Sequence, residues 1–278
     1  MPLISRPDNV ADGVILPQHF NKLRWSENFY EPFDVAPRFS NQLGNGAATG
    51  ATGDINELHT RINTFEWHVL GAGQTILVPV YDRVNGKGID FGQDQTISEG
   101  HQLRFGPNIV TAGNDRARGF FKIGTDKAFY GKIKINTSDA SGLGPFVFGL
   151  FKAQAYQTAL TSYTDFAVFN CTVNTTFADI QIKTSVASVV TTVGTTRTWL
   201  DNESHTFEIR VTQAGVVTFI LDGLVPTVTR SGFSFASGAF VQFGTFFLHA
   251  ADLADNLWYQ EAEGGFLGLR GDAGVRAA

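Results

Sequence analysis

Apolar and polar residues alternate with a period of two over much of this chain, most clearly in Thr206–Gly223. Phe207, Ile209 and Val211 alternate there with charged and hydroxyl-bearing side chains, which is typical of a β-strand with one buried face. Gln213-Ala214-Gly215 follows, and its glycine can adopt the positive φ of a tight turn. The alternation then resumes. The segment therefore predicts two antiparallel strands joined by a short turn.

The same reasoning predicts short strands along most of the chain after residue 64. The near-continuous apolar run Phe146–Lys152 predicts a central strand covered on both faces. Further strands are predicted at 65–69, 76–81, 89–96, 102–105, on both sides of 124–126, and at 166–173, 178–184, 186–193, 233–235, 240–248 and 257–259. Asp54 and Glu57 resemble a capping box, which predicts a short helix or turn over 54–61. Many short strands without a long helix predict an all-β sandwich or jelly roll.

The first 53 residues have a different composition from the rest. Five prolines between Pro2 and Pro37 disfavour a helix, and residues 41–53 have the composition of a flexible linker. Aromatic residues are nevertheless frequent, and we expect them to anchor an extended arm on a partner: Phe20, Trp25, Phe29, Tyr30, Phe33 and Phe39. The predicted organisation is an arm and Gly-rich linker (1–53), a sandwich (54–265) and a C-terminal tail (266–278).

Composition and charge restrict the classes of partner. The net charge is −5 and no cluster of Lys and Arg occurs, which argues against nucleic acid. No apolar stretch approaches the length of a membrane span, and the N-terminus lacks the pattern of a signal peptide. Cys171 is the only cysteine, so no internal disulfide can form. Its neighbours Phe169 and Val173 favour a buried structural thiol over a nucleophile.

No cofactor or metal site is expected. The six histidines lack the spacing of a zinc motif. Six aspartates are too scattered in sequence to form one calcium loop, although distant loops could assemble one: Asp90, Asp94, Asp126, Asp222, Asp252 and Asp255. Asp201-Asn202-Glu203 is interpreted as a turn before a strand, and Glu261-Ala262-Glu263 as solvated surface, rather than as catalytic carboxylates.

Four aromatic residues are candidate platforms for a sugar ring, although each also fits a place in the core or in an interface: Tyr156, Tyr163, Trp199 and Trp258. Arg270-Gly271-Asp272 matches an integrin-binding tripeptide. A match of three residues in a Gly- and Ala-rich tail is weak, and the residues 264–278 are interpreted as a second arm or a loose end.

The hairpin at Thr206–Gly223 resembles the late strands of concanavalin A-like and laminin G-like jelly rolls. Three other segments resemble virion proteins of tailed bacteriophages that carry such a jelly roll: Gly88–Thr96, Phe121–Tyr130 and Asp252–Gly264. The resemblance implies an all-β, concanavalin A-like jelly-roll β-sandwich with an extended N-terminal arm. It also implies a capsid decoration (cement) protein on the virion surface.

On this hypothesis the partners are the major capsid protein and neighbouring copies of the chain, so a homo-oligomer is expected. The alternative is a carbohydrate-binding, lectin-like module, either free or serving host adhesion. A glycoside hydrolase or lyase with a degenerate site is a third hypothesis. The glucanases that the fold resembles carry Glu-x-Asp-x-x-Glu on one strand, and this chain lacks that motif, so we do not expect an enzyme.

Overall fold

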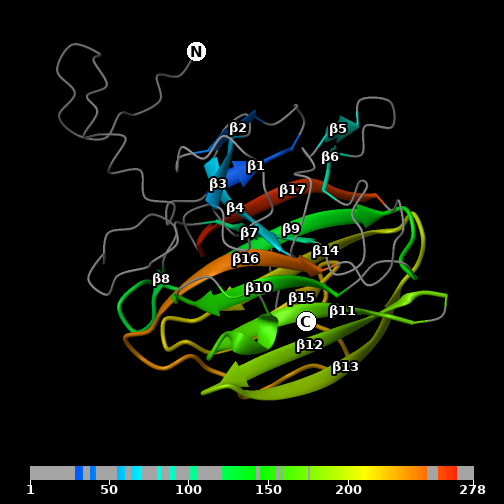
Figure 1. Cartoon of the computed structure of the whole chain (residues 1–278). Coiled ribbons are helices and arrows are strands. Elements are labelled where there is room, and N and C mark those ends of the chain that lie inside the picture. Colours follow the sequence, from blue (N-terminus) through cyan, green and yellow to red (C-terminus); the bar gives the residue numbers. More distant parts are fainter. Residues whose placement is uncertain are drawn as a thin grey trace, which may run out of the picture.

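The structure is a computed structural model of the 278-residue chain. It describes residues 29–33, 38–41, 55–59, 64–70, 80–82, 88–91, 100–105, 121–141, 145–154, 157, 159–174, 176–248 and 256–267. These residues form two antiparallel sheets that pack face to face (Figure 1). A single 3₁₀ turn at Leu160–Ser162 is the only helical element within the described part.

Within the described residues, the smaller sheet has seven strands. In spatial order it contains β15 (Val217–Leu221), β14 (Ser204–Val211), β9 (Phe129–Thr137), β17 (Leu257–Phe266), β6 (Gly88–Asp90) and β5 (Val80–Asp82), while β1 (Phe29–Glu31) also pairs with β17. Only the β14–β15 and β5–β6 pairs join strands that are consecutive in sequence. The other neighbours require long crossovers between the sheets, as in a jelly roll.

The larger sheet has ten strands among the described residues. Its order is β13 (Val189–Trp199), β12 (Ala178–Val186), β11 (Phe166–Val173), β10 (Phe146–Lys152), β16 (Phe240–Leu248), β7 (Gly100–Arg104), β4 (Thr64–Leu70), β3 (Ile55–His59) and β2 (Arg38–Asn41), and β8 (Phe121–Lys122) also pairs with β16. The predicted all-β sandwich is confirmed, and β10, β11 and β16 have the predicted bounds.

The core between the sheets is rich in phenylalanine. Phe146 of one sheet and Phe207 of the other are both fully buried, with ring centroids 6.0 Å apart. A second, smaller apolar cluster lies on the opposite face of the larger sheet: Val147, Phe151, Tyr163, Phe166, Val168 and Phe246. Alternate residues of β10 enter the two clusters. The prediction of a central strand covered on both faces is therefore confirmed.

Two local predictions differ from the structure. Residues 55–59 form strand β3, paired with β2 and β4, rather than the helix or turn predicted from the capping-box pattern. Pairing on both sides outweighs a weak local helix signal. Residues 233–235 form no strand and contribute only an isolated bridge from Ser234 to Val216. The side chains of Phe233 and Phe235 nevertheless lie in the core.

Part of the predicted arm belongs to the sheets. Phe29–Glu31 pairs with β17, and Arg38–Asn41 pairs with β3, so strands of both sheets begin before residue 54. Phe33 is fully buried and its ring meets that of Tyr259 edge-on, with centroids 6.1 Å apart. Phe33 is therefore part of this chain's own core rather than an anchor on a partner.

The prediction for the other anchors is not tested by the described part of the structure. Phe20 and Trp25 lie outside the described residues, and only the backbone is described for Phe29, Tyr30 and Phe39. Their role on a partner stays a prediction. The tail beyond residue 267, which includes Arg270-Gly271-Asp272, also lies outside the described residues.

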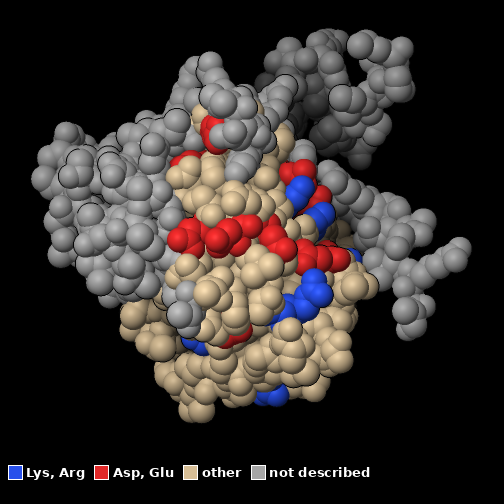
Figure 2. Space-filling view, turned by 90° about the vertical axis from the view of Figure 1, so that its right-hand side faces the viewer, with Lys and Arg blue, Asp and Glu red and all other residues tan. Residues whose placement is uncertain are grey.

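Charged side chains are unevenly distributed on the surface. On the face shown in Figure 2, acidic side chains of the described residues form a band, and basic ones lie at its margin. Such a face lacks the broad basic patch that binds nucleic acid. Among the described residues, no helix has the length and apolar character needed to cross a membrane.

Candidate functional site

An open hollow of about 410 Å³ lies where β13 passes the beginning of β14. It is lined by Thr196, Arg197, Thr198, Leu200, Glu203, Ser204 and His205. β13 is the outer strand of the larger sheet, whereas β14 belongs to the smaller one. The hollow therefore lies at the margin where the two sheets meet, and Asp222, just after β15, contacts its lining residues.

A β-bulge in β13 shapes one wall of the hollow. Ile180 is opposite Arg197 but Gln181 is opposite Gly194, so Thr195 and Thr196 have no partners across the ladder. Thr195 turns inward and its hydroxyl donates to the Ile180 carbonyl. Thr196 has φ 63°, which is an unfavourable conformation for a β-branched residue. Bulges and strained backbone are enriched at binding sites, where they redirect side chains.

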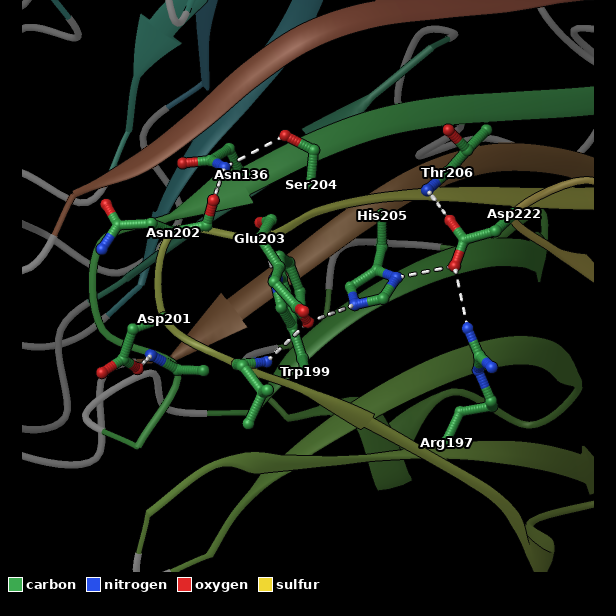
Figure 3. A network of polar contacts seen from close by, with 12 residues as sticks. Asn136, Arg197, Trp199, Asp201, Asn202, Glu203, Ser204, His205, Thr206 and Asp222 are labelled. Carbon is green, nitrogen blue, oxygen red and sulfur yellow. Dashed lines mark hydrogen bonds and ion pairs between the residues drawn. The ribbon is translucent and has the colours of Figure 1, made fainter.

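The opposite wall is the turn Asp201–Glu203, which the structure confirms as a turn before a strand. The backbone N–H of Asn202 donates to the Thr137 carbonyl at 2.8 Å. The side chain of Asn136 donates to the Asn202 carbonyl at 2.9 Å and to Ser204 Oγ at 3.0 Å. These bonds attach the turn to the end of β9 (Figure 3). The turn is thus held rigidly without any ligand.

Trp199 contacts the same turn through its indole ring. Its ring is fully buried and its Nε1–H donates to the Glu203 carbonyl at 3.0 Å. The Glu203 side chain returns over the turn, and its Oε2 accepts a hydrogen bond from the Leu200 N–H at 3.1 Å. Glu203 is therefore fixed at both its backbone and its carboxylate.

His205 lies between two carboxylates (Figure 3). Its Nδ1 is 2.8 Å from Asp222 Oδ2, and its Nε2 is 3.5 Å from Glu203 Oε2. The second distance is too long for a short hydrogen bond, and this contact is an ion pair only when the imidazole is protonated. The His205 ring meets the Trp199 ring edge-on, with centroids 5.5 Å apart. The histidine thus links the turn to the end of β15.

Asp222 completes the network. Burial alone raises the pKa of its carboxyl group, but hydrogen bonds from His205 and the Thr206 N–H, with the charges of His205 and Arg197, lower the pKa overall. Arg197 Nη2 lies 3.8 Å from Asp222 Oδ2, and the Arg197 side chain is 58% exposed. Arg197 therefore keeps most of its hydrogen-bonding capacity for a ligand.

The two carboxylates of this arrangement, Glu203 and Asp222, are already engaged by other groups of the chain. Both carboxylates contact the same imidazole, and Asp222 also accepts from the Thr206 backbone. A pair of acids for glycoside hydrolysis must instead flank a scissile bond. Among the described residues, no group of three or more His, Cys, Asp or Glu could hold a metal ion.

Three of the four predicted sugar platforms lie in the interior. Tyr163 and Trp199 are fully buried and Trp258 nearly so, so their ring faces are not presented to a solute. Tyr163 accepts a hydrogen bond from the Gln157 N–H and donates to Gln102 Oε1. The burial of these three residues agrees with a place in the core. Tyr156 lies outside the described residues.

The sequence analysis did not single out Arg197, His205 or Asp222 as one site. They are brought together from β13, β14 and the end of β15, and no spacing in the sequence indicates that contact. The sequence did predict the turn at Asp201–Glu203, and it offered Trp199 and Asp222 as members of two separate sets of candidates. Cys171 is buried as predicted, and burial raises the pKa of its thiol.

Comparisons with known proteins add little beyond the general layout. No family model matches the chain, and no curated protein matches it in sequence. Solved structures with a similar layout include the VIP36 exoplasmic/lumenal domain bound to Ca²⁺ and Man₃GlcNAc, with 13% identity, a TM-score of 0.49 and coverage of 75% of this chain and 89% of that one. At these values the fold assignment rests on the sheets themselves.

Two further structures have lower TM-scores. A legume lectin-like domain from Entamoeba histolytica has 7% identity and a TM-score of 0.46, covering 73% of this chain and 90% of that one. The CBM2 module of the evolved Dit of Lactobacillus casei BL23 phage J-1 has 12% identity and a TM-score of 0.41, covering 83% and 96%. Neither likeness carries an argument about the ligand of this chain.

Proposed function

We propose that this protein is a carbohydrate-binding module and that its sugar ligand occupies the hollow between β13 and the Asp201–Glu203 turn. The observation that carries the proposal is the preorganised set of polar groups around that hollow. Glu203 and Asp222 are held in place by His205 and by the turn, and Arg197 lies 3.8 Å from the Asp222 carboxylate. The binding group is assembled before any ligand arrives, so little conformational entropy is lost on binding.

The chemistry of these groups matches that of a sugar. Each hydroxyl of a pyranose can donate to a carboxylate and accept from a guanidinium, and charge-assisted hydrogen bonds are the stronger ones. Leu200 is exposed at the same hollow and offers an apolar surface to the C–H face of a ring. The volume of about 410 Å³ is near the lower end of ligand pockets, which measure roughly 300–1,000 Å³. This favours one or two sugar units.

A glycan array with the folded protein tests the proposal. We expect binding to a restricted set of glycans, and at least about a tenfold loss of affinity on Arg197→Ala or Glu203→Gln, as expected when one charge-assisted hydrogen bond is removed. Lys127→Ala is the matched control, because Lys127 is exposed on the turn between β8 and β9, outside the hollow. An array without signal from folded protein would contradict the proposal.

A second proposal concerns where the module acts. The resemblance of Gly88–Thr96, Phe121–Tyr130 and Asp252–Gly264 to phage virion proteins supports a place on a virion surface, where the module would serve as a capsid decoration protein or in host adhesion. Sedimentation with undecorated capsids separates the roles. Saturable binding at a fixed copy number supports decoration, and glycan binding without capsid binding supports an adhesion module.

A further inference from the structure

Strand β13 is the outer strand of the larger sheet, and among the described residues it pairs only with β12 (Figure 1). Its first four residues, Val189 to Thr192, are all exposed, and Val189 is 71% exposed. Successive residues of a strand point to opposite faces. This part of β13 is therefore exposed on both faces, and no described strand other than β12 pairs with it.

The sequence of this edge lacks the usual protection. No charged residue or proline occurs from Val186 to Thr196, whereas exposed edges are normally blocked by Lys, Pro, bulges or very short strands. The bulge at Thr195–Thr196 interrupts only the far end, next to the hollow. The residues before it are Val, Thr and Gly, and the first two favour strand pairing.

Apolar side chains extend this surface beyond the strand. The loop after β15 is attached to the β12–β13 hairpin by the Asp222–Arg197 ion pair and by a 3.4 Å hydrogen bond from Arg230 Nε to Thr184 Oγ1. Between these two attachment points the loop carries exposed Leu224, Val225 and Val228, and Leu224 is 73% exposed. The loop therefore runs along the hairpin and adds exposed apolar area beside it.

We propose that β13 pairs in antiparallel fashion with β13 of a second copy of this chain across a two-fold axis. In such a pair each residue faces another from the same stretch, so a charged edge would place like charges opposite each other. The stretch Val186–Thr196 contains no charge, and its Val and Thr residues form favourable cross-strand pairs. The loop with Leu224 would cover the flank of the new ladder.

Sedimentation equilibrium of the full chain over a range of concentrations tests this proposal. We expect a reversible dimer, and in Thr192→Lys a dissociation constant raised by at least about tenfold, because each copy would then carry a lysine on the paired edge, where lysine disfavours strand pairing. Thr218→Lys is the matched control, since Thr218 is an exposed threonine on β15, the outer strand of the smaller sheet. It should dimerise as the wild-type chain does.

Hydrogen exchange locates the interface independently. The amides of residues 189–194 should gain protection as the protein concentration rises, while those of β15 should not. A wild-type chain that stays monomeric at all concentrations overturns the proposal. So does a dimer that is unaffected by Thr192→Lys, which would show that another surface, or a different partner for this edge, is involved.

Discussion

Two histidines in this molecule occupy contrasting settings. His101 lies fully buried between the sheets, where Nε2 contacts the Tyr259 hydroxyl at 3.0 Å, and that hydroxyl donates to Thr245 Oγ1 at 2.9 Å. His205 lies at the margin of the sandwich between Asp222 and Glu203. The first is enclosed by aromatic rings, including Phe91 at 5.1 Å between centroids, and the second by carboxylates.

On the proposed function, the same side chain serves stability in one place and a binding site in the other. The His101 cluster spans the interior, since its members come from β7, β16 and β17 of both sheets, and no solute can reach it. The His205 cluster connects β14, β15 and the turn at an open hollow. We therefore expect changes at the first cluster to alter stability and changes at the second to alter binding.

The largest expected effect is at Trp199, which connects the two regions. Its ring is fully buried against Phe146 and Phe207, with centroids 6.0 and 5.6 Å away. Trp199→Ala should lower the free energy of unfolding by about 3–5 kcal/mol, as for other large core truncations, and should also abolish glycan binding. Urea denaturation measures the first effect. Trp199→Phe, which keeps most of the ring, should retain most of the stability.

The next effect is the pH dependence caused by His101. Burial lowers the pKa of His101 from its ordinary value of 6.5 to about 3. Between these values the unfolded chain binds a proton that the folded chain does not, so stability falls as the pH is lowered through that window. In His101→Gln this part of the fall should disappear. Denaturation at several pH values between 7 and 4 measures it, and parallel curves for both proteins would show that His101 does not contribute.

Asp222→Asn should lower the free energy of unfolding by a smaller amount. The contribution of the Asp222 carboxylate to stability decreases as the pH falls, in the same direction as that of His101. The folded pKa of Asp222 lies below its ordinary value of 3.8, so its stabilisation is present above that value and is lost as the pH falls through the folded pKa. With the carboxylate 31% exposed, we expect a loss of about 1 kcal/mol near pH 7. The difference from the wild-type chain should vanish in strong acid.

Arg197→Ala should have the smallest effect on stability. Its side chain is mostly exposed and its one ion pair of 3.8 Å is long, so the change should stay within about 0.5 kcal/mol. Binding should nevertheless fall. A large drop in the melting temperature of this variant would remove the distinction between the structural and the binding histidine clusters.

Periodicity predicted the strands well where both neighbours in the sheet follow the same pattern, as for β10 and β11. The helix or turn predicted over 54–61 from the capping-box pattern was wrong at 55–59. The apparent cap at Asp54 is a local signal, whereas β3 forms through pairing with two other strands. Part of the arm was misjudged for a similar reason. Prolines exclude a helix, but they do not reveal that Phe29–Glu31 adds to β17 or that Phe33 enters the core.

The candidate site was less predictable than the fold. Arg197, His205 and Asp222 meet only because a bulge reshapes β13 and because β14 begins at the margin where β15 ends. Nothing in the spacing of these residues indicates that contact. Aromatic side chains were the more obvious candidates in the sequence, but a sandwich of this size buries most of them.

The most direct test of the binding site is NMR mapping of a saccharide found on the array. Resonances of residues 196–205 and of Asp222 should shift and saturate with one dissociation constant, while those of the buried His101 cluster should not move. The same titration with Arg197→Ala should weaken all of these shifts together. Saturable shifts confined to another surface would contradict the assignment of the hollow as the sugar site.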